Sequence, residues 1–428
     1  MRIGLFSDTH LGCTVRDTRA GQYYRLDQFR LVPIEYDFAR SFNYIVDSFI
    51  EEKGNLDLIL HGGDFFHYPL RGTKTFLSEP SRVIGGRGIK KLNDLNIPIL
   101  IIDGNHGLYN IRRISSIRQF QIFENVKIFT FWRDAIRAIN KKEALVFNHD
   151  GVRVHAFPYI NPISMQIMSA KLYDRYQTWI NDYEFKFLTK SDKIDICLIH
   201  GMKADETFPN QLHPEKYDLF VAGHDHLFKP DGNFIIPGST ERWKFDPVNL
   251  VEEKQKRFFH FINIEKNEKP EIESVEIPIR RMIVESINID LDDTHQEIYG
   301  QIEKKLDEHE LIEKFDAESA ARVKIILTGN IGYSTWSNLS PNLTKLSNMV
   351  LSSPNYNVIQ FKIDKSMTYR DEAEKDVSQP GRAEILYLIE DPETEFLTFL
   401  KKLEIQKYDT QLLAQLFGKV INKTGDLQ

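Results

Sequence analysis

Aspartate, histidine and asparagine side chains follow several short apolar runs in the first 226 residues of the sequence, and glycine stands beside most of them. Each run is bulky and partly β-branched, which is typical of a buried strand in a sheet covered on both faces. Any one of these histidines, taken alone, is explained more simply by a core position or an ordinary turn. Together they favour one shared site. The segments are Asp8-Thr9-His10, Gly63-Asp64, Gly104-Asn105-His106, His200-Gly201 and Gly223-His224-Asp225-His226.

These segments supply more metal-ligating side chains than one ion needs: two carboxylates, one amide oxygen and four imidazoles. A mixed nitrogen and oxygen donor set without thiolates suits Mn²⁺, iron or Zn²⁺ better than a soft metal. A carboxylate can bridge two ions, and paired ions about 3.5–4 Å apart are a recurrent solution for phosphoester cleavage. The candidate ligands are Asp8, His10, Asp64, Asn105, His200, His224 and His226.

Two further histidines stand next to these candidates. His106 follows Asn105 directly and is placed to protonate a leaving oxygen or to stabilise charge that builds up on a phosphate. His61 precedes Gly62, where it could support the site or simply belong to the core. The residue types therefore favour metal-assisted cleavage of a phosphate ester.

The elements that must position these side chains are strands alternating with helices. Apolar runs at residues 2–7, 56–60, 97–103, 194–199 and 217–222 predict the strands, and residues 35–52 predict a helix with one apolar face. In open α/β sheets, ligands bind at the carboxyl edge of the strands. An α/β fold therefore explains why the polar segments follow the strands.

Length and composition limit the remaining possibilities. At 428 residues the chain is too long for one core and should form two or three domains. No apolar run approaches the roughly 20 residues that span a membrane, and a strand that begins at Arg2 leaves no room for a signal peptide. Two cysteines, Cys13 and Cys197, form no disulfide framework or zinc motif. We therefore expect a cytoplasmic protein without membrane contact.

The charge is unevenly distributed. The net charge of −7 argues against a uniformly basic nucleic-acid binder. Residues 71–118 nevertheless hold nine basic and three acidic side chains, and this stretch surrounds Gly104-Asn105-His106. The basic surplus is either an approach for nucleic acid or an ordinary solvated surface.

The motif series resembles the calcineurin-like metallophosphoesterases. Within that superfamily, three segments look like the SbcD-type nuclease subunit of double-strand-break repair (the Mre-eleven family). The resemblance covers residues 1 to about 245 and, more loosely, the rest of the chain. It implies two packed mixed β-sheets flanked by helices. The three segments are Asp8-Thr9-His10-Leu11-Gly12, Gly63-Asp64-Phe65-Phe66-His67 and Pro237-Gly238-Ser239-Thr240-Glu241-Arg242-Trp243.

The resemblance also implies roles for individual residues. It places one ion on Asp8, His10, Asp64 and His226, and a second ion on Asp64, Asn105, His200 and His224. It implies two Mn²⁺ ions, with His67 and His106 in phosphate handling and catalysis. The implied activities are 3′→5′ exonuclease and single-strand endonuclease. One position departs from the pattern, because the family usually has an acidic residue where this chain has Gly107.

Basic residues are the candidates for DNA contacts. Arg242 could instead lock the loop after Pro237. The candidates are Arg71, Arg87, Lys90, Arg112, Arg113 and Arg242.

We divide the chain into a metallophosphoesterase nuclease domain at residues 1–275, a small α/β DNA-capping domain at 276–365, a tether at 366–390 and a helical tail at 391–428. Apolar tail residues at helical spacing predict helices that either fold back on the body or bind a partner. The resemblance implies that this partner is an SbcC-like coiled-coil ABC-type ATPase, and it implies a homodimer and a cytoplasmic or nucleoid-associated location. The candidate partner-binding residues are Phe396, Leu400, Leu403, Leu412, Leu416, Phe417 and Val420.

The hypothesis is thus a two-metal DNA nuclease that processes double-strand ends and single strands in break repair. One alternative is a metallophosphoesterase that acts on phosphoproteins or cyclic nucleotides. The other is a DNA-end-binding scaffold whose catalysis is weakened at Gly107.

Overall fold

The structure, a computed structural model, describes residues 1–370 except 16–17, 68–76, 109–113, 190, 203–206, 243–244 and 246–255. The described residues belong to one compact unit, Met1–Arg370. The predicted tail at 391–428 and nearly all of the predicted tether at 366–390 lie outside them, and the predicted domain boundaries stay predictions. Among the helices of the described part, none is long and apolar enough to cross a membrane.

The first of two six-stranded sheets has the strand order β14-β13-β1-β4-β5-β6. Its strands β1, β4, β5 and β6 run parallel, and β13 pairs antiparallel with both β1 and β14. The carboxyl ends of the four parallel strands therefore lie at one edge. The strands are β1 (Arg2–Phe6), β4 (Leu58–His61), β5 (Ile99–Ile102), β6 (Val126–Phe129), β13 (Phe258–Asn263) and β14 (Glu271–Glu276).

The second six-stranded sheet has the order β11-β12-β10-β9-β8-β7. Its central strands β8, β9, β10 and β12 are parallel, and an antiparallel strand closes each edge. The strands are β7 (Val146–His149), β8 (Val152–Phe157), β9 (Ile194–His200), β10 (Leu219–Gly223), β11 (Lys229–Asp231) and β12 (Phe234–Ile236).

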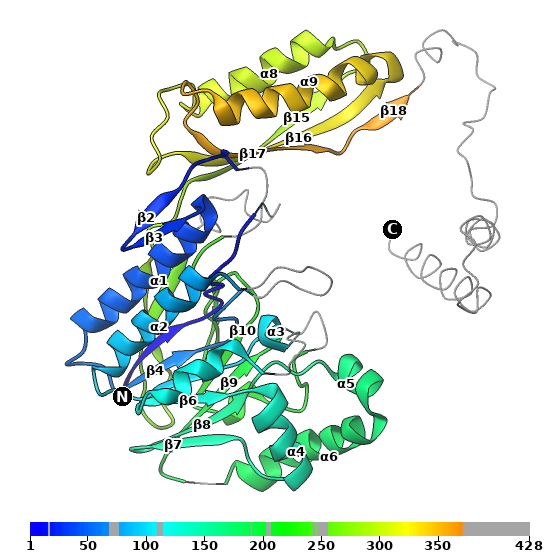
Figure 1. Ribbon diagram of the computed structural model, residues 1–428. Helices are drawn as coiled ribbons and strands as arrows, with labels where there is room; N and C mark the ends of the chain where they lie inside the picture. The colour runs from blue at the N-terminus through cyan, green and yellow to red at the C-terminus, as the bar shows by residue number, and fades with distance from the viewer. Residues whose placement is uncertain are drawn as a thin grey trace, which may run out of the picture. The chain divides into compact units, whose positions relative to one another are not determined.

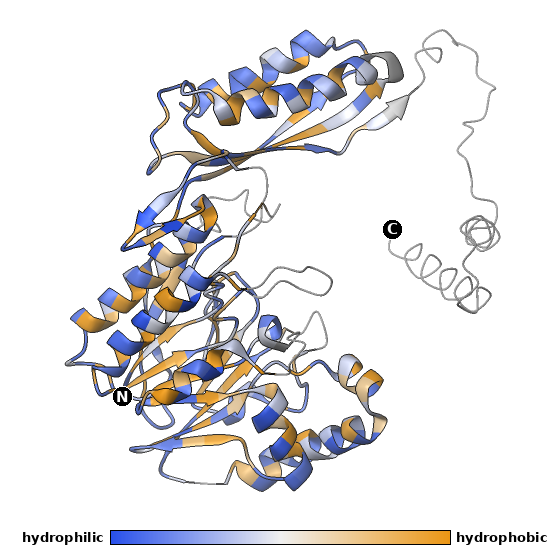
Figure 2. Ribbon diagram, viewed as in Figure 1, coloured by the Kyte–Doolittle hydropathy of each residue, from blue (hydrophilic) through white to orange (hydrophobic). Residues whose placement is uncertain are grey.

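The parallel strands are buried on both faces because alternate side chains point to opposite sides of a sheet. Leu5 and Leu100 pack into a core shared with the second sheet, whereas Phe6 and Ile101 pack into a core with the helices α1 (Pro33–Glu51) and α2 (Glu79–Asn93). Orange, hydrophobic residues are frequent in the central strands, whereas the helices alternate between orange and blue (Figure 2). The predicted α/β fold, with two packed mixed sheets flanked by helices, is confirmed.

Shorter elements complete this part of the chain. The helix predicted at residues 35–52 begins two residues earlier, since Pro33 occupies the first helical position, where its missing N–H costs no hydrogen bond. The other elements are α3 (Asn105–Leu108), α4 (Ile136–Lys141), α5 (Pro162–Met168), α6 (Ala170–Phe187), the hairpin β2 (Tyr24–Leu26) and β3 (Phe29–Leu31), and short helical turns at Ser116–Ile122, Phe131–Ala135 and Pro214–Lys216.

A separate four-stranded sheet follows, in which β15, β16 and β17 are parallel neighbours and β18 pairs with β16. Two helices cover the same face of this sheet (Figure 1) and bury a core of their own against it. The elements are β15 (Met282–Ile289), α8 (His295–Glu308), β16 (Ala321–Gly332), α9 (Tyr333–Ser352), β17 (Val358–Lys365) and β18 (Thr368–Arg370).

A buried ion pair connects helix α1 to the segment that enters this sheet. The Arg280 guanidinium donates to both oxygens of Asp37 at 2.8 Å and to the carbonyl oxygen of Ala320 at 2.9 Å. Each side chain of the pair is only 1% exposed. Such a pair contributes little over a hydrophobic replacement, but the loss of one partner leaves an uncompensated buried charge.

Replacing Asp37 by alanine is therefore expected to lower the free energy of unfolding by about 3–5 kcal/mol, because Arg280 is left buried and unpaired. Urea unfolding of the whole chain measures this. Asp47→Ala is the matched control on the same helix, since Asp47 is 59% exposed in its pair with Lys91 and should contribute less than about 1 kcal/mol. Equal effects of the two substitutions would contradict the assignment.

A second charge network predicts how stability changes with pH. Burial would raise the pKa of Asp195, but the His155 ring 3.6 Å away and hydrogen bonds from Arg153 and Lys266 hold it well below its usual range. A depressed folded-state pKa contributes stability that is present above about pH 4 and is lost as the pH falls below it. Asp195→Asn should therefore be less stable at pH 7 and lose less further stability between about pH 5 and pH 2. Thermal unfolding of both proteins across that pH range measures this. Parallel curves of melting temperature against pH for the two proteins would contradict the prediction.

Candidate metal centre

The predicted ligand residues all lie where the parallel strands of the two sheets end. Asp8 and His10 follow β1, Asp64 follows β4, and Asn105 begins α3 after β5. His200 is the last residue of β9, and His224 and His226 follow β10. The Nδ1 of His200 lies 2.7 Å from the carbonyl oxygen of Gly62, so the two sheets meet at this edge. The structure thus brings all seven candidates into one place.

The backbone in these turns is held in a costly conformation. The φ angles of Asp8, His10, Asp64 and His224 are 50°, 45°, 50° and 93°. L-residues avoid this region at a cost of about 1–2 kcal/mol each, and such strain is concentrated at functional sites. Hydrogen bonds from Asp8 N to Gly63 O (3.0 Å) and from His10 N to Asp64 O (2.9 Å) hold the first two turns together.

The first donor cluster consists of Asp8, His10 and His226. The Nε2 atoms of the two histidines are 3.1 Å apart, and Asp8 Oδ1 lies 3.7–3.9 Å from them. Asp8 Oδ2 accepts hydrogen bonds from Ser7 and from the backbone of His224. Oδ1, in contrast, is buried and accepts no hydrogen bond from the described residues. This buried, unsatisfied carboxylate oxygen and the two imidazole nitrogens that it faces together form a donor set for a cation.

The second cluster consists of Asp64, His200 and His224, with Asn105 beside them. Asn105 Oδ1 lies 3.1 Å from His200 Nε2 and 3.1 Å from His224 Nδ1. Because His200 Nδ1 faces the Gly62 carbonyl and donates to it, Nε2 is the nitrogen through which His200 would bind an ion in this cluster.

Asp64 connects the two clusters. Its Oδ1 accepts a hydrogen bond from the backbone N–H of His106 at 2.9 Å. Its Oδ2 lies 3.5 Å from His200 in the second cluster and 3.8 Å from His10 in the first. One carboxylate oxygen therefore faces both groups of imidazoles, which is the arrangement of a bridging ligand.

The residues fit a pair of divalent ions. Donors that surround one ion at about 2.0–2.2 Å lie roughly 3.0–3.6 Å apart, which is close to the separations within each cluster. Burial lowers the pKa of His226 to about 3 and that of His10 well below its usual value, so both rings are neutral at pH 7. Neutral imidazole is the form that binds a metal ion.

His67 and His106, the predicted catalytic residues, lie over the first cluster. Their ring centroids are 4.4 Å apart, and both rings pack edge-on against His10 at 5.3 and 4.9 Å. His67 Nδ1 lies 3.3 Å from His10 Nδ1. Two imidazoles thus stand beside the donors, within reach of a phosphate bound there.

The structure gives a steric reason for glycine at position 107. A Cβ atom at this position would lie 1.8 Å from Oδ1 of Asp103. The Asp103 carboxyl is buried and accepts a hydrogen bond from Ser115 at 2.8 Å, while burial raises its pKa to about 7. The space in which a side chain at position 107 would begin is therefore filled by a carboxyl group from four residues earlier.

Three further residues contact the site and were not singled out as functional from the sequence. Ser7 donates to Asp8, and Thr9 is 2.7 Å from His61. The Tyr159 ring lies 6.0 Å from that of His200 and 5.7 Å from that of His224. Tyr159 follows β8 as the ligands follow their strands, a signal that the sequence already contained.

The candidate DNA contacts are spread over different environments. Arg87 and Lys90 are exposed on α2, where they pair with Asp27 and Asp94. Arg242 is only 3% exposed and donates to the carbonyl oxygen of Arg280, which is the loop-locking alternative. Arg71, Arg112 and Arg113 lie outside the described residues, as do the predicted partner-binding residues of the tail.

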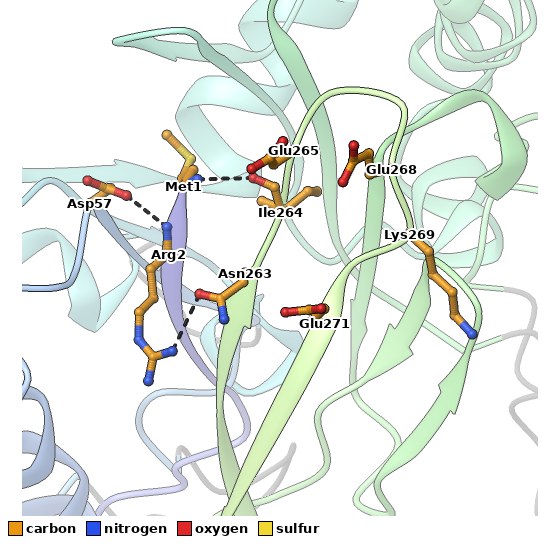
Figure 3. Close-up of a pocket in the computed structure, with 9 residues that line it drawn as sticks. All are labelled: Met1, Arg2, Asp57, Asn263, Ile264, Glu265, Glu268, Lys269 and Glu271. Carbon is orange, nitrogen blue, oxygen red and sulfur yellow. Dashed lines mark hydrogen bonds between the residues drawn. The ribbon is translucent and has the colours of Figure 1, made fainter.

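A cavity of about 430 Å³ lies elsewhere, at the amino end of β1 (Figure 3). Polar and charged side chains line most of it, including those of Asp57, Glu265 and Glu271. Because Asp8 follows the opposite end of the same strand, this cavity is separate from the metal centre.

Comparison with known proteins agrees with the fold. Residues 1–228 match the calcineurin-like phosphoesterase family, and because this is more than half of the chain, the protein belongs to that family. Among individual proteins, it is similar to the DNA double-strand break repair protein Mre11 of Saccharolobus solfataricus, with 25% identity over 66% of this chain and 65% of that one. The proteins of the same name from Methanococcus maripaludis (26% identity, 59% of this chain and 60% of that one) and Sulfurisphaera tokodaii (23% identity, 66% and 64%) are also similar. The matches thus span less than two thirds of these relatives.

Proposed function

We propose that the protein is a two-metal-dependent DNA nuclease that processes DNA ends in double-strand-break repair, as a 3′→5′ exonuclease and a single-strand endonuclease. The observation that carries the proposal is the pair of donor clusters sharing Asp64 at the carboxyl edge of the sheets. Membership of the phosphoesterase family and the similarity to proteins named for double-strand break repair support it.

In the reaction, a pair of divalent ions would supply Lewis acidity toward the phosphodiester and lower the pKa of water. Asp8, His10, Asp64 and His226 would hold one ion, and Asp64, Asn105, His200 and His224 would hold the other. We propose Mn²⁺, although the same nitrogen and oxygen donors also suit iron or Zn²⁺.

The chain's own groups have separate tasks. The backbone N–H of His106 donates to Asp64, and its ring packs against His10 and His67. The ring therefore has a defined position from which to donate a proton to the leaving oxygen or stabilise charge on the phosphate. His67, whose ring lies beside it at a tilt, is placed to orient the phosphate. Basic side chains on α2, such as Arg87 and Lys90, offer phosphate contacts that position the strand.

Two partners complete the proposal. The tail at residues 391–428 binds a coiled-coil ABC-type ATPase through its apolar stripe, and two copies of the chain form a homodimer through a surface near residues 71–96 or 112–123. The sequence pattern of the tail and the resemblance support these assignments. Removal of residues 391–428 should abolish copurification with the ATPase and leave the intrinsic nuclease activity in place.

The test is cleavage of defined DNA substrates in the presence of Mn²⁺, Mg²⁺, Zn²⁺ or a chelator. We expect shortening of recessed double-strand ends and nicking of circular single strands with Mn²⁺, and neither with the chelator. Hydrolysis of phosphopeptides or cyclic nucleotides without DNA cleavage would instead support the phosphoprotein or cyclic-nucleotide alternative.

A substitution distinguishes the scaffold alternative from the proposed nuclease. His106→Ala should retain both metal ions and DNA binding, and lose about 10²–10⁴-fold in cleavage rate, the usual contribution of a positioned acid. If the wild type and His106→Ala bind DNA equally and neither cleaves it, the result supports the DNA-end-binding scaffold. The Asp103 carboxyl packed against Gly107 argues for an intact catalytic loop.

A further inference from the structure

The two turns that carry Asp8, His10 and Asp64 are connected by a side-chain contact as well as by their backbones. His61 is the last residue of β4 and is fully buried. Its ring lies between Phe6 and Phe65, with centroids 4.7 and 5.1 Å away. From there it reaches the neighbouring turn, where its Nε2 lies 2.7 Å from Thr9 Oγ1.

The hydrogen bonds define the protonation of this ring. The backbone N–H of Gly63 donates to His61 Nδ1 at 3.2 Å, so Nδ1 is an acceptor. Burial lowers the pKa of His61 to about 3, so the ring is neutral at pH 7 and carries its single proton on Nε2. Nε2 therefore donates to the Thr9 hydroxyl. Each ring nitrogen serves one of the two turns.

We propose that His61 and Thr9 form a clasp that positions the ligand-bearing turns for metal binding, with His61 as a positioning residue rather than a ligand. The clasp rests on the metal centre of the proposed function. Thr9 lies between Asp8 and His10, and Gly63 immediately precedes Asp64, so the clasp acts on three ligands at once. All three have positive φ angles, and their turns relax if nothing holds them.

The clasp has a chemical signature that a core histidine lacks. If His61 only filled space in the core, the side chain at position 9 would not need a hydroxyl group. In the clasp, the hydroxyl is the acceptor for a fully buried N–H, and both residues are 0% exposed. Removing only that hydroxyl leaves the donor unsatisfied and frees one turn relative to the other.

The experiment compares Thr9→Val with Thr9→Ser in the full chain and measures Mn²⁺ binding by titration calorimetry. We expect Thr9→Val to bind Mn²⁺ at least about 10-fold more weakly than wild type, as losses of groups that orient metal ligands do. Thr9→Ser keeps the hydroxyl and should bind within about 2-fold of wild type. The melting temperature without metal is measured alongside to separate metal affinity from stability.

A double-mutant cycle with His61→Leu tests the pairing itself. In the clasp, Thr9→Val should weaken binding much less when leucine already replaces His61, because the contact is already lost. If His61→Leu does not fold, the two Thr9 variants decide the question alone.

Unchanged Mn²⁺ affinity in Thr9→Val, or an equal loss in Thr9→Ser, would overturn the clasp. Failure of the wild-type protein to bind Mn²⁺ would count against the metal centre of the proposed function. This outcome is therefore distinguishable from a failure of the clasp alone.

Discussion

Replacing Asp64 by asparagine is expected to remove one of the two proposed metal ions and to lower the proposed DNA cleavage by at least about 1,000-fold. The asparagine would keep the oxygen that accepts from the His106 backbone, so the turn should retain its geometry. It would lose the negative charge that faces both donor clusters at 3.5 and 3.8 Å. Several kcal/mol of transition-state stabilisation depend on such ions, which corresponds to the stated factor.

Metal content after gel filtration and single-turnover cleavage of a labelled strand measure the two effects. Asp225→Asn is the matched control, because Asp225 stands between His224 and His226 but pairs with Lys229 at 2.5 Å and belongs to neither donor cluster. It should retain both ions and a rate within a few-fold of wild type. Two bound ions and normal cleavage in Asp64→Asn would disprove the shared-carboxylate arrangement.

Gly107→Asp is expected to damage the protein, although it restores the acidic residue that the family usually has there. The new Cβ would lie 1.8 Å from Asp103 Oδ1, and the buried Asp103 carboxyl cannot move without losing its hydrogen bond from Ser115. Overpacking of this kind costs about 1–3 kcal/mol, and a second carboxyl in the same buried space adds to it. We expect a lower melting temperature and displacement of the adjoining His106.

Gly107→Ala separates the steric part from the charge, since it adds only the Cβ. The double variant Gly107→Asp with Asp103→Gly should recover much of the stability and activity, because it exchanges the position of the carboxyl rather than adding one. The measurements are thermal unfolding and Mn²⁺-dependent cleavage. If Gly107→Asp is more active than wild type, the Asp103 carboxyl does not replace the missing acidic side chain. That result would support the alternative of a scaffold whose catalysis is weakened at Gly107.

Local order along the chain made much of the fold and the site predictable. A strand followed by a polar turn is encoded by neighbouring residues, because the two-residue period of a strand determines which side chains emerge at its end. Asp8, Asp64 and Asn105 were found in this way, each a few residues beyond a buried apolar run. The buried runs also predicted the α/β class, which is confirmed.

Other features depend on contacts between residues distant in sequence, and no local period encodes these. The sequence left His61 between a core position and a supporting role, and only its contact with Thr9, 52 positions away, distinguishes the two. Arg242 was a candidate for DNA, yet it is buried against Arg280. Gly107 looked like a simple loss until its neighbour Asp103 was seen to fill the space.

The sequence by itself therefore determined which residues stand at the ends of strands and that their chemistry suits metal ions. The tertiary structure decided how they are divided into two clusters. That division requires the second sheet to deliver His200, His224 and His226 opposite the first, with Asp64 between them. The physical reason is that strand formation follows local side-chain patterns, whereas the stacking of two sheets depends on the packing of their shared core.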